Sequence, residues 1–265
     1  MQVFIVKFKN MSSLGKLLDE LGADKAFSKQ KKIVVKPNLI TNIPYPITTD
    51  PALVEQLILY IKNCSSAKII IAEGSGDDTE RNFKELGYTE LAEKYSIRLI
   101  DLNNCETVLL KNPRAECLKQ FHFPKILLNS FLISFACLKH HHATDVTLSL
   151  KNMFGIAPGK IYSYNIRGKP WAKKALHDLG LEQCITDINL YKIPNLALID
   201  GRVAQLGSEQ SGPTKEIGLL FGSWSAIAVD AVAAEYLGFK HIDYIEKLAK
   251  LYNIDLSKVK VMKWE

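Results

Sequence analysis

The feature that most constrains the fold is a regular alternation of short apolar runs with amphipathic stretches. The runs have the length and composition of buried strands, and the stretches between them carry apolar residues at helical spacing. Strands alternating with helices favour a parallel or mixed sheet with helices packed against it. We therefore predict an α/β fold with a mixed, mainly parallel sheet flanked by helices. The predicted strands cover residues 3–7, 32–36, 67–72, 97–101, 126–138, 196–199 and 259–262, and the predicted helices cover 14–21, 51–63, 80–95 with a break at Gly87, 146–154, 172–189 and 226–237.

The length of 265 residues is ample for a buried core without disulfides or metal ions. We predict a single domain over residues 1–265, built as one unit or as two interlocked lobes. A lobe boundary is predicted near residues 110–125, because the surrounding segment has the pattern of an inserted or edge hairpin.

Composition and charge argue against several classes of protein. The net charge of +6 is spread along the chain, and no nucleic-acid-binding motif accompanies it. The most apolar stretch falls short of the roughly 20 residues of a membrane span, and the first residues do not resemble a secretory signal. Five widely spaced cysteines fit reduced thiols, and no pair has the spacing of a zinc or iron–sulfur site. We expect a cytoplasmic protein that binds neither nucleic acid nor a membrane.

Polar residues follow the apolar run at residues 33–35. Lys36 and Asn38 come directly after it, and Thr48 and Thr49 stand before a predicted helix. Loops at the carboxyl ends of strands bind ligands in open α/β sheets, and this set of side chains suits a carboxylate or phosphate. The alternative is an ordinary strand exit followed by an Asp50 helix cap.

Two acidic residues end other predicted strands. Glu73 is followed by Gly74-Ser75-Gly76, which lacks the third glycine of a dinucleotide fingerprint. Asp200 precedes Gly201. Each is a candidate ligand-binding carboxylate, with a plain strand-end acid or turn residue as the alternative. Asp230 lies in an Ala/Val-rich helical segment, where it could bind a ligand, cap a neighbouring element or pair with a lysine.

The densest polar region runs from Lys139 to Gly155. If the strand extends to residue 142, His140 and His142 share one face and could bind a metal with a third ligand such as His177. In the helix predicted next, Thr147 and Lys151 fall on one face, and Asn152 follows. A lysine fixed there could act as a base or clamp an oxyanion. The alternative is a solvated helix face beside a histidine-rich loop.

Together these segments resemble the bacterial and archaeal domain-of-unknown-function family 362. The resemblance spans residues 32–238 and is carried by VVKPNLI, TTDP, IIIAEG, LISFACLKHHHATDVTLSLKNMFG, ITDINLYKIPNLALIDG, SGP and AVDAVAAEYLG. It implies an α/β fold and aligns Lys139, His141, Lys151 and Asn152 with the family's polar signature. Many members carry a ferredoxin-like C-x-x-C-x-x-C module, which this chain lacks, so a ferredoxin could act only as a separate partner. The family's S-x-D segment is replaced here by Ser223-Trp224-Ser225.

We therefore predict an enzyme or ligand binder with a pocket for a small anionic metabolite. The candidate catalytic residues are His141, which would move a proton, Lys139 and Lys151. The candidate ligand-binding residues are Lys36, Asn38, Thr48, Thr49, Glu73, Thr147, Asn152 and Asp200, with His140 and His142 as candidate metal ligands. Two alternatives stay open, a redox-associated accessory protein that uses an iron–sulfur partner or binds metal through His and Cys, and a non-catalytic scaffold. The sequence names no cofactor, and serine-hydrolase, phosphate-loop and H-E-x-x-H motifs are missing.

Overall fold

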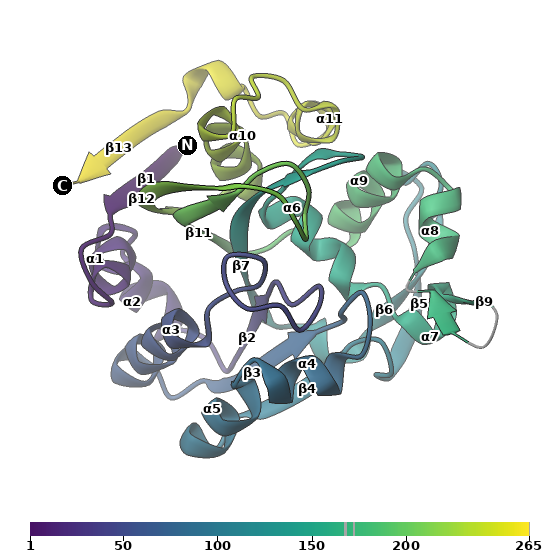
Figure 1. The fold of residues 1–265 in the computed structure, drawn as a ribbon, viewed down its shortest axis with the longest axis horizontal. Coiled ribbons are helices and arrows are strands. Elements are labelled where there is room, and N and C mark those ends of the chain that lie inside the picture. The colour runs from purple at the N-terminus through teal and green to yellow at the C-terminus, as the bar shows by residue number, and fades with distance from the viewer. Residues whose placement is uncertain (167–168, 172, 265) are drawn as a thin grey trace.

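A long mixed sheet forms the centre of the protein (Figure 1). The computed structural model describes residues 1–166, 169–171 and 173–264. Within them, nine strands form one sheet, with β8 added beside β7. In spatial order the strands are β13 (Lys260–Trp264), β1 (Gln2–Lys7), β12 (Thr214–Ser223), β11 (Leu196–Gln205), β7 (Phe131–His141), β2 (Lys32–Pro37), β3 (Lys68–Glu73) and β4 (Arg98–Asp101), and β8 is Asp145–Thr147.

The pairing is mainly parallel. The run β11-β7-β2-β3-β4 is parallel throughout, and β13 is parallel to β1. By contrast, β12 is antiparallel to β1 and β11, and β8 is antiparallel to β7. The predicted mixed, mainly parallel α/β fold is confirmed.

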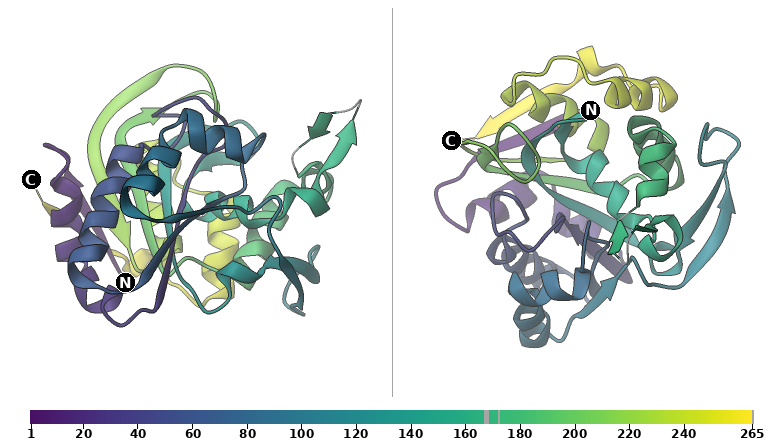
Figure 2. Two further views of the ribbon diagram at one scale, coloured as in Figure 1. Left: turned by 90° about the horizontal axis from the view of Figure 1, so that it is seen from below. Right: turned by 45° about the vertical axis from the view of Figure 1, so that its right-hand side comes forward.

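Helices cover both faces of the sheet (Figures 1 and 2). Successive side chains of a strand point to opposite faces, so β7 sends Ile133 and Phe135 into one core and Leu132 and Ala136 into the other. The first core is covered by α1 (Ser13–Glu20), α2 (Ala23–Phe27), α3 (Pro51–Cys64), α4 (Thr79–Glu85) and α5 (Tyr88–Tyr95). The second is covered by α6 (Ser149–Asn152), α8 (Lys174–Asp178), α9 (Leu181–Tyr191), α10 (Ala226–Tyr236) and α11 (Asp243–Leu251).

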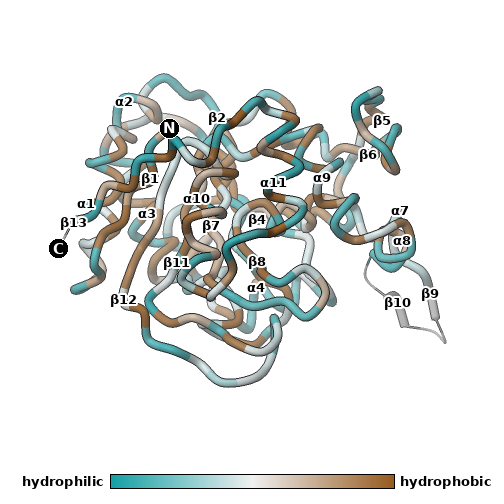
Figure 3. Tube along the Cα trace, turned by 90° about the horizontal axis from the view of Figure 1, so that it is seen from above, coloured by the Kyte–Doolittle hydropathy of each residue, from teal (hydrophilic) through white to brown (hydrophobic). Residues whose placement is uncertain are grey.

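Smaller elements complete the chain. A hairpin of β5 (Thr107–Lys111) and β6 (Gln120–Pro124) lies outside the main sheet, on the side away from β13 (Figure 3). The lobe boundary predicted near residues 110–125 falls in this hairpin, and a division there stays a prediction. The other elements are the hairpin of β9 (Tyr164–Ile166) and β10 (Lys169–Trp171), α7 (Gly159–Tyr162), and the short 3-10 turns Lys125–Leu127, Met153–Ile156 and Leu256–Lys258.

The prediction of a helix over residues 146–154 is wrong for its first residues. Residues 145–147 instead form β8, which turns back from β7 through Asp145 at a positive φ of 58° and pairs Thr147 with Lys139. The helix α6 begins only at Ser149. Thr147 and Lys151 therefore lie on different elements, and their predicted position on one helix face does not hold.

Other elements also differ from the expectation. The helix predicted over 172–189 is two helices separated at Gly180, whose φ is 99°. The strand predicted to end at Ile199 continues to Gln205 through a bulge after Gly201, and β12 was not predicted. The break predicted at Gly87 is confirmed, because it separates α4 from α5.

In the described parts of the chain, every helix is too short or too polar to cross a bilayer.

Candidate anion-binding site

The carboxyl ends of three adjacent parallel strands converge on one cavity of about 490 Å³. Lys139 lies near the end of β7, Lys36 near the end of β2, and Glu73 at the end of β3. This edge of a parallel sheet is the usual ligand site of an open α/β fold. The lining includes Lys36, Asn38, Glu73, Gly74, Lys139, His141, His142, Thr147, Lys151, Asn152, Phe154, Gly155, Lys173, His177 and Glu209.

A buried ion pair forms one wall. Lys36 Nζ lies 2.8 Å from Glu73 Oε1, and both side chains are no more than 3% exposed. Lys36 Nζ also donates to Asn152 Oδ1 at 2.9 Å and to the Pro37 carbonyl at 3.2 Å. Glu73 accepts from the backbone N–H groups of Leu39 and Gly74 at 3.0 and 2.7 Å. Burial lowers the pKa of Lys36, and the charge and hydrogen bond of Glu73 oppose that shift. Lys36 is therefore the ion-pair partner of Glu73 and is not available to a ligand.

Among the described residues, the hydrogen-bond partners of two further buried lysines are uncharged oxygens. Lys139 Nζ donates to Asn38 Oδ1 at 2.7 Å and to the Ile47 carbonyl at 2.6 Å. Lys173 Nζ donates to the carbonyls of Gly74 and Gly155 at 2.5 and 3.2 Å. Burial lowers the pKa of Lys139 to about 8 and that of Lys173 to about 7. An ammonium group has three N–H donors, so each keeps one for a ligand.

The fourth lysine, Lys151, has a different environment. Its Nζ lies 5.1 Å from the centroid of the Phe154 ring and has no hydrogen bond to any described residue. Burial, together with the nearby charges of Lys139 and Lys36, lowers its pKa to about 8. The hydroxyl of Thr147, a residue only 5% exposed, also lacks a partner within the described ranges. An ammonium and a hydroxyl thus line the cavity with unused hydrogen-bonding capacity.

The charges around the cavity do not balance. Five lysines line the described cavity, and Lys174 pairs with Asp178, so four ammonium groups face the carboxylates of Glu73 and Glu209. Burying uncompensated charge is costly, which explains the lowered lysine pKa values. An anion in the cavity would offset this excess and favour the protonated lysines.

Two glycines from separate loops make the floor possible. A Cβ on Gly155 would lie 2.4 Å from Glu73 Oε1 and 2.6 Å from Lys36 Nζ, and one on Gly74 would lie 2.4 Å from the Gly155 carbonyl oxygen. These spacings are too short for non-bonded atoms. Glycine at position 74 lets the two backbones meet, and glycine at position 155 leaves room for the Lys36–Glu73 pair beside it.

The Gly155→Ala substitution should displace the Lys36 and Glu73 side chains and disturb their ion pair. We expect it to lower the free energy of unfolding by about 1–3 kcal/mol, the usual cost of overpacking, and to weaken anion binding. Denaturant unfolding and calorimetric titration with sulfate measure the two effects. Gly15→Ala is the control, because a Cβ there meets nothing within 4 Å; equal behaviour of the two variants would contradict this role for Gly155.

The three consecutive histidines take different positions. His141 Nδ1 accepts the Ala143 N–H at 3.1 Å, and burial and Lys151 lower the pKa of this imidazole to about 3. His141 is therefore neutral and carries its proton on Nε2, 4.0 Å from Glu209. His142 stacks on it, with Nδ1 3.0 Å from Glu209 Oε2.

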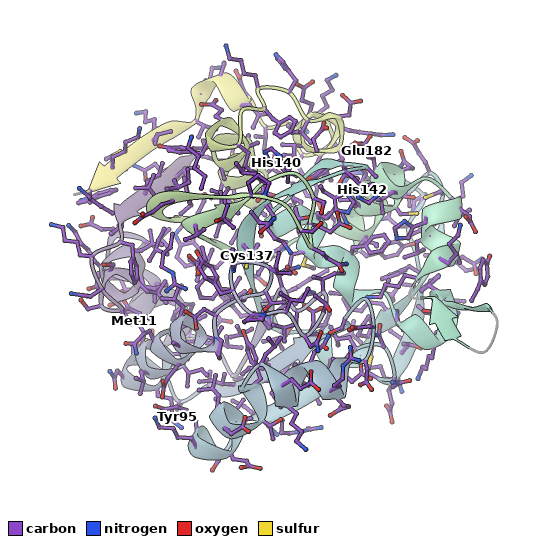
Figure 4. The ribbon with its side chains drawn as sticks, viewed as in Figure 1. Met11, Tyr95, Cys137, His140, His142 and Glu182 are labelled. Atoms are coloured by element: carbon purple, nitrogen blue, oxygen red, sulfur yellow. The ribbon has the colours of Figure 1, made fainter. Side chains whose placement is uncertain are left out.

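His140 does not share a face with His142, contrary to the expectation. It lies beside the C-terminal end of α10 (Figure 4), where Nε2 donates to the Leu237 carbonyl at 3.2 Å and Nδ1 accepts the Gly207 N–H at 3.2 Å. Both nitrogens of His140 are therefore occupied. Because β7 ends at His141, the strand alternation does not reach residue 142 and does not place His142 on the face of His140. His140 is not placed to share a metal with His142.

A different trio has ligand atoms within 4.8 Å of one another, namely His141, His142 and Glu209. His141 Nε2 carries the proton there, and a coordinating nitrogen must have a free lone pair. The neighbouring lysines also oppose a cation. The geometry therefore suits a hydrogen-bond donor set better than a metal site.

Three other predicted ligand residues do not line the cavity. Thr49 accepts the Asn38 N–H and donates to the Phe135 carbonyl, both at 2.8 Å, and Thr48 donates to the Ile43 carbonyl at 2.7 Å. Asp200 is paired with Arg202 at 2.8 Å and accepts from the Tyr45 hydroxyl at 3.1 Å. These side chains fix loops beside the site. The alternative reading of Asp50 as the cap of α3 is confirmed.

Lys173 and Glu209 were missed as site residues. Lys173 belongs to the basic segment GKPWAKK, which is typical of a solvated surface, and Glu209 lies in the loop between β11 and β12. Neither follows a predicted strand. No local pattern distinguishes them from exposed charges.

Asp230 has the capping role that the sequence left open. Its two carboxyl oxygens accept the N–H groups of Ser149 at 2.9 Å and Leu150 at 2.7 Å, at the start of the helix that carries Lys151 and Asn152. Burial raises its pKa to about 8, and the two backbone bonds oppose that shift. Asp230 therefore positions α6 from the neighbouring helix α10.

The Asp230→Asn substitution should cost about 1–3 kcal/mol of stability, because an amide offers one acceptor oxygen to two buried N–H groups. We also expect weaker anion binding, since α6 would shift. Thermal unfolding and sulfate titration test this. Asp255→Asn, in the exposed cap of residues 256–258, is the control; equal losses in the two variants would count against the positioning role.

Comparison with known proteins finds a matching family model and a similar protein. The family model described as "Domain of unknown function (DUF362)" matches residues 33–235. The thylakoid-associated protein sll1697 of Synechocystis sp. is 24% identical over 234 residues, which cover 86% of this chain and 70% of that protein. The family match contains all the residues that line the cavity.

Proposed function

The chain belongs to the DUF362 family, and from the arrangement of its buried lysines we propose that it binds a small dianion, a carboxylate or phosphate compound, at the carboxyl ends of β7, β2 and β3. The observation that carries the proposal is five lysines around one cavity, of which Lys174 pairs with Asp178, against two carboxylates among the described lining side chains. Charge-assisted N–H donors of this kind are the strongest recognition elements for carboxylate and phosphate oxygens.

In this proposal each group has a defined role. Lys139 and Lys173 each contribute one remaining N–H, Lys151 contributes its whole ammonium group, and Thr147 contributes a hydroxyl. His141 acts as a donor through Nε2–H. Its Nδ1 is engaged by Ala143, so it is poorly placed to move a proton as the sequence suggested. Lysines with a pKa of about 8 are better matched to proton transfer near neutral pH.

The test is calorimetric titration with sulfate, which is a dianion at every pH of interest, and with succinate. The Lys151→Met variant loses no hydrogen bond to a described residue, so it should fold normally and bind about 10–100-fold more weakly. The double variant Lys139→Met/Lys151→Met should show no measurable binding. Lys240→Met is the control, because Lys240 is exposed and lies outside the cavity lining.

Unchanged affinity in the double variant, with circular dichroism showing a folded protein, would overturn the proposal. The alternative roles, an accessory to a ferredoxin-type partner or a scaffold, stay predictions from the sequence, as does the cytoplasmic location. Thylakoid association is stated only for the cyanobacterial relative.

A further inference from the structure

Lys151 differs from the other lysines that line the cavity in its freedom to react, and of these Lys174 is paired with Asp178. The Lys36 ammonium group forms an ion pair with Glu73 and a hydrogen bond to Asn152. Lys139 and Lys173 are each anchored by two oxygen acceptors. The Lys151 amine lines the same cavity without a hydrogen bond to a described residue, and it packs against the Phe154 ring. A cavity that holds an anion through the anchored lysines would therefore present one unanchored amine to the bound molecule.

We infer that Lys151 is a nucleophile that forms an imine with an aldehyde or ketone bearing a carboxylate or phosphate group. The inference rests on the proposed anion site, since the anionic group must bind Lys173 to bring the carbonyl carbon to Lys151, and the remaining N–H of Lys139 is then left for the carbonyl oxygen. It adds the substrate class, an anionic carbonyl compound, and a covalent step to that proposal.

The chemistry needs a neutral amine and a proton donor. A pKa of about 8 leaves about a tenth of Lys151 neutral at pH 7, against fewer than one in a thousand for an ordinary lysine. Desolvation beside a second cation is a known way to activate a lysine. Lys139, whose pKa is also about 8, supplies the ammonium acid.

The step balances without an oxidant or reductant. The nitrogen lone pair attacks the carbonyl carbon, the C=O π electrons move to oxygen, and proton transfer from nitrogen to oxygen gives a neutral carbinolamine. Lys139 then protonates the hydroxyl, water leaves as the C=N bond forms, and the iminium proton returns to Lys139. The products are one imine and one water molecule. The Thr147 hydroxyl, which lacks a partner among the described residues, is available to the carbinolamine oxygen.

The experiment traps this imine. Pyridoxal 5′-phosphate, a phosphorylated aldehyde, is incubated with the full chain at low concentration, sodium borohydride is added, and the labelled peptide is identified by mass spectrometry. Glyoxylate serves as the carboxylate probe. We expect one predominant adduct at Lys151, prevented by excess sulfate. Lys240→Met should label as the unchanged chain does.

The Lys151→Arg variant separates this inference from the proposed function. Arginine keeps the charge but cannot form a stable imine under these conditions, so the variant should still bind sulfate, more weakly than the unchanged chain, while the adduct at this position disappears. Sulfate binding with no sulfate-protected adduct at Lys151 would overturn the inference alone. Predominant labelling of Lys173 or Lys139 would overturn the assignment to Lys151. Failure of the unchanged chain to bind sulfate would overturn the proposed function itself.

Discussion

Replacing Lys36 by methionine should lower the free energy of unfolding at pH 7 by about 3–5 kcal/mol, the usual cost of breaking a buried ion pair from one side. The variant leaves the Glu73 carboxylate, a group 2% exposed, without its cation, and the donors that remain to it within the described ranges are the backbone N–H groups of Leu39 and Gly74. It also removes the donor that holds Asn152 Oδ1. Guanidinium unfolding followed by tryptophan fluorescence measures the loss.

The matched control is Lys94→Met, which breaks an ion pair of similar length, 2.7 Å, on the surface. Lys94 is 63% exposed and pairs with Glu55, so solvent screening should make the loss of stability far smaller than that of Lys36→Met. If Lys36→Met costs no more than Lys94→Met, the Lys36–Glu73 pair is not the structural base of the site.

Sulfate affinity should fall at least tenfold between pH 7 and pH 9. The pKa values of Lys173, at about 7, and of Lys139 and Lys151, at about 8, place their loss of charge in this interval. Sulfate keeps its own charge, so the change would report on the lysines. Calorimetric titration at half-unit steps measures it; an affinity that stays constant to pH 9 would contradict the assignment.

Stability of the ligand-free protein should change in the opposite direction. A lysine with a lowered pKa binds fewer protons in the folded chain than in the unfolded chain, so its contribution to stability rises with pH across this interval. We expect the melting temperature without sulfate to rise from pH 7 towards pH 9, and the additional stabilisation by sulfate to shrink. In Lys139→Met/Lys151→Met both trends should flatten.

The residues that follow strands could be assigned to the site from the sequence. Lys36, Glu73 and Lys139 end strands that the apolar runs reveal, and parallel strands bring their carboxyl ends to one edge. The structure places all three beside the cavity, together with Asn38, Thr147, Lys151 and Asn152. The hydrophobic pattern was therefore enough to find the residues at strand ends, whereas Thr147 and Lys151 were predicted on one helix face and lie on different elements.

Other features depend on contacts between distant segments. Lys173 enters the site because two carbonyls from separate loops accept its N–H groups, and α6 begins at Ser149 because Asp230, 81 positions along the chain, caps it. The buried Asp200 was expected to bind a ligand, but its carboxylate pairs with Arg202 and does not line the cavity. Local patterns carry no information about such partners, which explains why these positions were missed or misplaced.

The most direct test of the lysine site is the number of protons taken up when sulfate binds at pH 8, measured by calorimetry in buffers of different ionisation enthalpy. Lysines that are partly neutral in the free protein must be protonated around the dianion, so we predict an uptake of about one proton or more per sulfate. Lys139→Met/Lys151→Met should show neither sulfate binding nor this uptake. Tight sulfate binding by the unchanged chain with no proton uptake would contradict the account, because the buried lysines would then not be the groups that receive the anion.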